Sequence, residues 1–231
     1  MSSSTLRSPG ASRRSGFSGM TQTLLICVIV AVGAFEAMWF EVVTDTGLAV
    51  ADPAVVGWLV AHRSPRLVGA AQLVSVVGAP AVSVTAAVMV VGWSAWRLRW
   101  RAAALAVVGT GLLITVDVGM KAAVARARPP VGWHGVSVQG YAFPSGHALL
   151  SAGVVLLLAW LVHRHDLLPV GRGSGIALGV VAGCFLVAVG ASRVVLAVHF
   201  PSDVLAGWSL AVFVVAALGF VDVASVRQVA A

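Results

Sequence analysis

Long apolar stretches alternate with short polar segments along almost the whole chain. A helix needs about 20 residues, with a range of roughly 17–25, to cross the hydrocarbon core of a bilayer, so stretches of this length predict transmembrane helices. The six stretches lie near Thr21–Val43, Arg66–Trp93, Ala102–Met120, Gly146–Val162, Ile176–Ala191 and Ser202–Val221. The pattern therefore predicts an all-α integral membrane protein with six transmembrane helices.

Local signals refine this layout. The fourth and fifth stretches are short, so we expect their helices to extend into the polar residues at their ends. The second stretch is long, and Gly78-Ala79-Pro80 within it predicts a kink. Between the first two stretches, Asp52 and Pro53 are typical of a helix start, which predicts a short surface helix over Ala54–Ala61 with Asp52 as its cap.

Composition supports a membrane protein and excludes several other classes. The 231 residues are 59% hydrophobic and 10% charged, which is too apolar for a soluble domain. The net charge of +7 does not indicate nucleic-acid binding, because the cations lie in short segments rather than on one basic face. We expect a disordered tail over residues 1–20, a membrane domain over 21–223 and a short tail over 224–231.

The distribution of Lys and Arg predicts the orientation. We expect the first stretch to remain as an uncleaved span, since further apolar stretches follow it. If the N-terminus is inside, nine of the fifteen Lys and Arg residues fall in inner segments. The clearest inner loop is Arg97–Arg101. The positive-inside rule therefore places both termini in the cytoplasm.

Three polar clusters stand at the ends of apolar stretches. They are Lys121-x6-Arg128-Pro129, Pro144-Ser145-Gly146-His147 and Ser192-Arg193-x5-His199-x3-Asp203. Consecutive spans run in opposite directions, so these positions are expected to gather at one membrane surface, the outer one in the orientation above. The sequence therefore predicts a single site at the outer membrane surface.

The residue types in these clusters suit a phosphate ester. Lys121, Arg128 and Arg193 supply three fixed cations for the charge on phosphate oxygens, and the planar fork of Arg binds two oxygens at once. Ser145 and Gly146 precede an apolar helix, whose free N–H groups favour an anion. No carboxylate, His or Cys residues recur at metal-ligand spacing, so we expect neither a metal nor another cofactor.

His199 and Asp203 are one helical turn apart. A carboxylate at this distance holds an imidazole in one tautomer, which makes the other nitrogen a nucleophile. Each residue alone also has a plainer explanation: an interfacial cation whose stem lies in the membrane, a capped helix or a surface histidine. The combined spacing favours the functional interpretation.

The three clusters together resemble the signature of the type 2 phosphatidic acid phosphatase family, which includes bacterial lipid phosphatases. The similarity is consistent with the apolar layout from about Thr21 to Val223. It implies a hydrolase in which His199 attacks phosphorus, His147 acts as general acid and Asp203 supports His199. The phosphate-binding residues implied by the resemblance are Lys121, Arg128, Ser145, Gly146, Ser192 and Arg193.

The motifs specify only the phosphate. Phosphatidate, phosphatidylglycerophosphate, undecaprenyl diphosphate and diacylglycerol diphosphate all combine a phosphate with an apolar tail. We expect a lipid phosphate substrate, a bacterial cell membrane and a site facing outside; the oligomeric state is left open. Two rivals remain: a vanadate-dependent haloperoxidase-like enzyme and a non-catalytic lipid-binding or transport protein.

Three further polar residues have roles that the pattern leaves more open. Asp117 lies four residues before Lys121, which predicts a structural ion pair on one helix face. Glu36 lies within the first span, as either a partnered carboxylate or a group near the substrate. Arg126 is similar to an extra basic residue beside the family motif and is predicted to help bind head groups.

Overall fold

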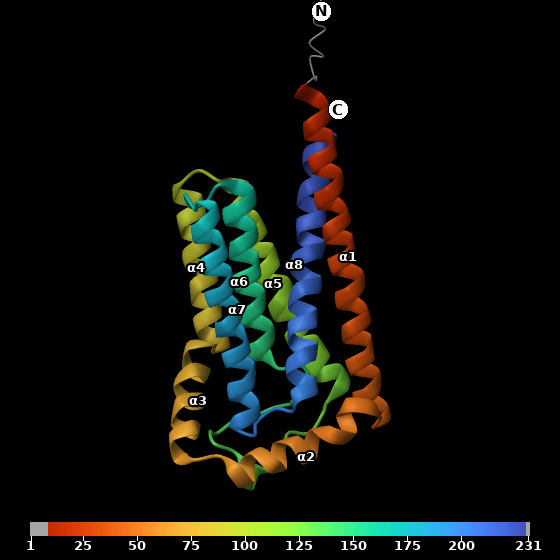
Figure 1. Ribbon diagram of the computed structural model, residues 1–231, viewed down its shortest axis with the longest axis vertical. Coiled ribbons are helices and arrows are strands. Elements are labelled where there is room, and N and C mark those ends of the chain that lie inside the picture. The colour runs from red at the N-terminus through yellow and green to blue at the C-terminus, as the bar shows by residue number, and fades with distance from the viewer. Residues whose placement is uncertain (1–8, 230–231) are drawn as a thin grey trace, which may run out of the picture.

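The computed structural model describes residues 9–229 and is built from helices throughout this part (Figure 1). The helices are α1 (Pro9–Thr44), α2 (Gly47–His62), α3 (Pro65–Val77), α4 (Pro80–Trp96), α5 (Trp100–Val124), α6 (Gly146–His165), α7 (Arg172–Val195) and α8 (Pro201–Val229), with a 3-10 turn at Val131–Trp133. Six segments within the described part are long and apolar enough to cross a membrane, namely Gly19–Thr44, Pro65–Trp96, Trp100–Val124, Gly146–His165, Gly173–Val195 and Pro201–Val226. The predicted all-α, six-span architecture is confirmed.

The helical ends extend further than hydropathy indicates. The backbone is helical from Pro9, whereas the sequence predicts a disordered tail over 1–20. Residues 1–8 of that tail, and 230–231 of the tail predicted at 224–231, lie outside the described residues. Adding a residue to a formed helix gains a hydrogen bond without a new nucleation cost, so an apolar span extends readily into a polar flank.

The second span is broken where the sequence predicts a kink. α3 ends at Val77 and α4 begins at Pro80. A Cβ atom on Gly78 would lie 2.5 Å from a methyl carbon of Val189 on α7, so glycine allows the break to contact that helix. The close contact holds α3 against α7 near the end of the bundle.

α2 runs across one end of the bundle and joins α1 to α3 (Figure 1). It begins at Gly47 after Thr46, so the prediction that Asp52 caps a helix starting near Ala54 is wrong. The carboxylate of Glu41 accepts the Leu48 N–H at 2.9 Å and so satisfies a first-turn donor. Asp52 is instead an interior residue of α2, with 1% of its surface exposed.

α6 is the centre of the bundle and packs against α4, α5, α7 and α8, while α1 lies along α8 (Figure 1). α8 approaches α6 closely at Gly207, where a Cβ atom would lie 2.8 Å from the Ser145 carbonyl oxygen. The N-terminal ends of α6 and α8 are therefore side by side. Both carry polar clusters, which brings the sequence motifs together.

Candidate active site

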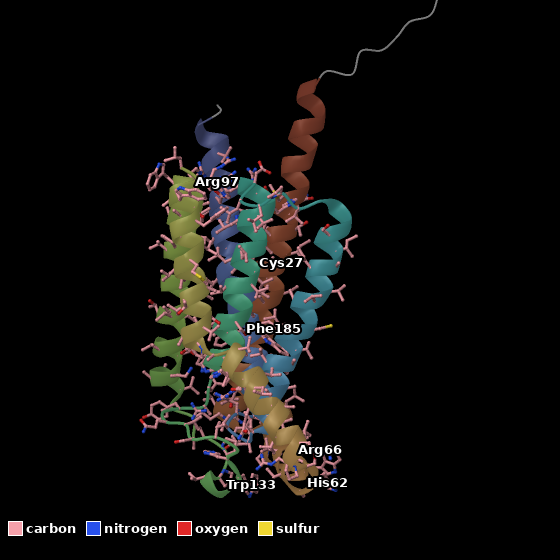
Figure 2. The ribbon with its side chains drawn as sticks, turned by 90° about the vertical axis from the view of Figure 1, so that its left-hand side faces the viewer. Cys27, His62, Arg66, Arg97, Trp133 and Phe185 are labelled. Carbon is pink, nitrogen blue, oxygen red and sulfur yellow. The ribbon has the colours of Figure 1, made fainter. Side chains whose placement is uncertain are left out.

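All three polar clusters lie at the end of the bundle opposite the chain termini, here called the motif end (Figure 1). Figure 2 places Trp133 at this end and Arg97 at the other, here called the termini end. Lys121 belongs to the last turn of α5, Arg193 to the last turn of α7 and Asp203 to the first turn of α8. The predicted gathering at one surface is thus what the fold produces.

His199 is buried in the connection between α7 and α8. Its Nδ1 lies 3.4 Å from Asp203 Oδ2, and its Nε2 lies 3.1 Å from Arg128 Nη1. A guanidinium only donates, so Nε2 faces it as the acceptor and the ring proton belongs on Nδ1, beside Asp203. In this tautomer Nε2 carries the lone pair of the ring and directs it at the Arg128 guanidinium.

Burial keeps the His199 imidazole neutral. It lowers the pKa of His199 to about 4, and the positive charges of Arg128 and Arg193 act in the same direction. The Asp203 carboxylate opposes them but does not outweigh desolvation. At neutral pH the ring is therefore uncharged.

Asp203 is held on both carboxylate oxygens. Its Oδ2 accepts the Phe200 N–H at 2.8 Å, and its Oδ1 accepts from Arg126 Nη1 at 2.6 Å. The side chain has no exposed surface. These bonds fix the carboxylate that faces His199.

Two guanidiniums beside His199 have no carboxylate partner among the described residues. Arg128 donates to the backbone oxygens of Gln139, Gly140 and Val198 at 2.7–3.1 Å. Arg193 is 3% exposed and donates to the Ser75 hydroxyl, while its Nε has no partner in the described part of the chain. Burial lowers the pKa of Arg128, yet a guanidinium remains charged at neutral pH. Two positive charges are thus left uncompensated at this place.

Lys121 differs from these two arginines because it is already paired. It forms the predicted ion pair with Asp117 and donates to the Pro144 carbonyl oxygen at 3.0 Å. A Cβ atom on Gly146 would lie 3.0 Å from Asp117 Oδ1 and 3.2 Å from Lys121 Nζ. Glycine at 146 therefore lets the pair rest against the start of α6.

Ser145 occupies the cap position of α6 but does not cap it with its side chain. Its backbone N–H donates to the Asp203 carbonyl oxygen at 2.9 Å. Its hydroxyl is buried and has no hydrogen-bond partner among the described residues. A buried hydroxyl without a partner is costly, which suits a site completed by a bound ligand. His147 follows in the first turn and is partly exposed.

Two polar residues of the motif region make contacts within the protein that bear on their expected roles. The Ser192 hydroxyl donates to the Val189 carbonyl oxygen at 2.6 Å, so in this arrangement its proton is not offered to a phosphate. Arg126 does not present its guanidinium to head groups, because it joins Asp203 to Asp52 over the Phe200 ring.

Asp52 and Ser75 are the site residues that sequence reasoning missed. They come from α2 and α3, far along the chain from the motifs they contact. Asp52 offered one weak signal, a carboxylate within an apolar segment, which we interpreted as a cap. Ser75 offered none.

A groove of about 400 Å³ lies beside the site, between α1, α5 and α8. It is lined by Val32, Phe35, Glu36, Trp39, Met120, Ala123, Leu210 and Phe213. Met120 immediately precedes Lys121, and the Phe35 ring centroid lies 6.0 Å from that of Phe143, two residues before Ser145. The lining of the groove is therefore almost wholly apolar, with Glu36 as its carboxylate. Its Met120 wall lies next to the cationic end of the bundle.

No group of three or more His, Cys, Asp or Glu side chains within the described residues is placed to hold a metal ion. Metal independence stays a prediction of the sequence.

The chain is similar to phosphatidylglycerophosphatase B of Bacillus subtilis (strain 168), with 37% identity over 106 residues. The match covers 46% of this chain, and it spans half of that relative's length. A crystal structure of a transmembrane PAP2-type phosphatidylglycerolphosphate phosphatase from Bacillus subtilis matches over 86% of this chain and 96% of that one. The TM-score of this match is 0.66 and the identity 27%.

The model of the PAP2 superfamily matches residues 99–222, slightly more than half of the chain. This range includes all three polar clusters, and with them His199, Asp203, the two uncompensated guanidiniums and the unpartnered Ser145 hydroxyl. The resemblance inferred from the motifs is confirmed, and the chain belongs to the PAP2 superfamily.

Proposed function

We propose that the protein is a membrane-bound phosphatase that removes the phosphate from a lipid phosphate through a phosphohistidine on His199. The observation that carries this proposal is the pair of guanidiniums without carboxylate partners among the described residues, Arg128 and Arg193, beside an imidazole whose Nε2 lone pair faces Arg128 Nη1. Fixed positive charge in a buried site is what stabilises the oxygens of a transferring phosphoryl group.

Substrate binding would give partners to donors that have none among the described residues. A phosphate placed at His199 Nε2 takes over the Arg128 Nη1 donor that now faces that nitrogen. Other phosphate oxygens can accept from Arg193 and from the Ser145 hydroxyl, both of which have unused donors among the described residues. Binding therefore frees the nucleophile in the same step that neutralises the cations.

The chemistry follows in two balanced steps. In the first, Nε2 of His199 forms a bond to phosphorus, the ester P–O bond breaks, and His147 gives a proton to the departing alkoxide. In the second, water attacks phosphorus, the P–N bond breaks, and His147 takes the proton from the water. Asp203 stabilises the positive charge that the imidazole carries between the two steps.

The apolar groove supports a lipid as the substrate. A greasy chain lying along α1, α5 and α8 would leave its phosphate near Lys121, at the rim of the cationic site. The curated relative and the matching crystal structure, both from Bacillus subtilis, are named as phosphatases of phosphatidylglycerophosphate, so we propose a lipid monophosphate of that type. A lipid diphosphate would present the same terminal phosphate.

The proposed location is the bacterial cell membrane, with both termini in the cytoplasm and the site outside. The excess of Lys and Arg at the termini end supports this orientation. A variant lacking Cys27 and Cys184 can carry one cysteine at position 99 or at position 133. An impermeant thiol reagent on intact cells should label position 133. Labelling at 99 instead would reverse the orientation.

The function is tested by phosphate release from the purified protein in detergent. Phosphatidylglycerophosphate, phosphatidate, undecaprenyl diphosphate and diacylglycerol diphosphate form the panel, and His199→Ala is the matched control. We expect release from at least one lipid, unaffected by excess EDTA and inhibited by vanadate. Turnover that EDTA abolishes and magnesium restores would contradict the metal-free mechanism.

The rival functions are outcomes of the same preparation. Bromination in the presence of vanadate without phosphate release would indicate a haloperoxidase. Binding of the four lipids with no turnover of any would indicate a non-catalytic lipid-binding protein.

A further inference from the structure

A buried ionic chain behind the site begins on α2, outside the part of the sequence that the family model matches. Arg126 binds two carboxylates, one through each Nη atom of its guanidinium. Nη1 donates to Asp203 at 2.6 Å, and Nη2 donates to Asp52 at 2.8 Å. Asp52 is 1% exposed and Asp203 not at all. These contacts therefore link Asp52 through Arg126 to Asp203, and Asp203 in turn faces His199.

Asp52 also fixes the start of α8. Its Oδ1 accepts the Ser202 N–H at 3.2 Å, and its Oδ2 accepts the Ser202 hydroxyl. Ser202 is the second residue of α8, so a carboxylate from another helix satisfies one of its first-turn donors. The next residue is Asp203, whose position relative to His199 depends on how α8 begins.

The charges of Asp52, Arg126 and Asp203 do not cancel. One guanidinium lies between two carboxylates, which leaves a net negative charge next to the imidazole. Without Asp52, Arg126 would neutralise Asp203 completely. A neutralised Asp203 stabilises a positive imidazole less and holds its Nδ1 proton less firmly.

We propose that Asp52 is a positioning residue for catalysis: it holds Arg126 and the start of α8 so that Asp203 keeps its place and its charge beside His199. This role rests on the proposed phosphatase function but touches neither the substrate nor the reacting atoms.

The other charged and titratable groups around His199 belong to the phosphate site and are left unchanged by a substitution of Asp52. They are Arg128 after α5, Arg193 on α7 and His147 on α6, and Lys121 on α5 acts on His147. Phosphate binding should therefore survive the loss of Asp52, while the nucleophile is weakened. This separates an effect on kcat from an effect on KM.

The test compares Asp52→Asn with Asp222→Asn. Asp222 is an equally buried carboxylate that contacts an arginine and a histidine at the termini end, so its replacement is the same chemical change away from the site. Asp52→Asn should lower kcat roughly 10–100-fold, the usual cost of losing a group that orients a functional residue, with little change in KM. Asp222→Asn should retain kcat within about twofold, since the contacts of Asp222 among the described residues lie at the termini end.

A second readout does not depend on turnover. Selective ¹⁵N labelling of histidine in the purified protein, with His199 assigned from a His199→Gln sample, reports which ring nitrogen carries the proton. The wild type and Asp222→Asn should show His199 protonated on Nδ1 at neutral pH. Asp52→Asn should show a mixture of tautomers. If the wild type hydrolyses no lipid phosphate, the proposed function fails while this readout still decides the role of Asp52.

The proposal is overturned if folded Asp52→Asn keeps the Nδ1 tautomer and full kcat. It is also overturned if its kcat falls only in proportion to its folded fraction, as a purely structural role would require. If Asp52→Asn does not fold, Ser202→Ala decides in its place, because it removes the hydroxyl that both Asp52 and Arg126 contact. A smaller shift in the same direction supports the role, and an unchanged tautomer with full kcat rejects it.

Discussion

The two ends of the bundle each bury a polar cluster, but the clusters differ in how completely they are satisfied. At the termini end, Asp222 contacts Arg101 at 2.9 Å and His165 at 3.0 Å, one on each carboxylate oxygen. At the motif end, Arg128 and Arg193 have no carboxylate partner among the described residues, and the Ser145 hydroxyl has no partner there either.

This difference distinguishes a structural cluster at the termini end from a candidate binding site at the motif end. Asp222 ties α8 to α5 and α6, and both of its carboxylate oxygens have a partner. Buried polar groups are costly unless they are paired, so the unsatisfied cations at the motif end need a reason other than stability. In the proposed function, the phosphate of the substrate supplies that negative charge.

The largest expected effect on activity comes from replacing the histidine at each end of the bundle with alanine. His199→Ala should abolish phosphate release from every substrate, because the bond to phosphorus cannot form. His165→Ala should keep most of the activity and only lower the thermal midpoint. Phosphate release and thermal unfolding of both purified variants check this. Equal activity losses in His199→Ala and His165→Ala would remove the distinction between the structural cluster and the candidate site.

His147→Ala sharpens the same comparison within the motif end. General acid catalysis contributes roughly 10²–10⁴-fold, so turnover of a lipid monophosphate should fall by about that factor. Nitrophenolate leaves without a proton, so the variant should recover on nitrophenyl phosphate while His199→Ala does not. If His147→Ala loses the same factor of turnover on both substrates, His147 holds the phosphate and donates no proton.

The arginines at the two ends give the next contrast. Arg128→Gln removes a donor aimed at the developing charge and should lower kcat/KM roughly 10²–10³-fold. Arg101→Gln removes a cation that is 51% exposed and should leave kcat/KM nearly unchanged. Vanadate inhibition measured on both variants serves as the binding readout. An unaltered vanadate affinity in Arg128→Gln would show that this cation does not bind the anion.

Glycine substitutions are expected to have smaller effects. In Gly146→Ala the new methyl group meets Asp117 and Lys121 at 3.0–3.2 Å, so the pair must shift and activity should fall about tenfold. Gly119→Ala on α5 is the matched control, because a Cβ atom at this position meets nothing within 4 Å. It should leave activity intact and stabilise α5 slightly, since alanine is the better helix former. An active Gly146→Ala would show that the close approach is not needed.

Acidification should have the mildest effect. Burial lowers the pKa of His199 from 6.5 to about 4, so the ring should remain neutral at pH 6 and accept its proton only as the pH approaches 4. An unfolded chain takes up that proton near pH 6.5, so acid weakens the folded state across this interval. A ¹⁵N titration of His199 measures the midpoint directly. A midpoint at or above 6.5 would contradict the buried, neutral nucleophile.

Local sequence signals were sufficient for much of this molecule. The lengths of the apolar stretches specify the spans, because a bilayer tolerates few other structures. The i,i+4 spacing of Asp117 and Lys121 specifies their pairing on one helix. The polar motifs specify their own gathering, because each stands at the end of a span.

What the sequence could not supply is the support behind the motifs. Asp52 reaches Ser202 from 150 residues away and Ser75 reaches Arg193 from 118 residues away. Such contacts depend on how α2 and α3 pack against the bundle end, which no local pattern records. For the same reason Arg126 was interpreted as a ligand of head groups, although two buried carboxylates engage it.

The central claim is that the motif end transfers a phosphoryl group to His199, and trapping the intermediate tests it most directly. The purified protein is mixed with a lipid carrying ³²P in its phosphate, quenched within the first turnover and digested, and the labelled peptide is sequenced. We expect an acid-labile, base-stable phosphohistidine at position 199, absent from His199→Ala and present in Asp222→Asn. Label on Ser145, or rapid phosphate release with no labelled protein at any time, would contradict the account.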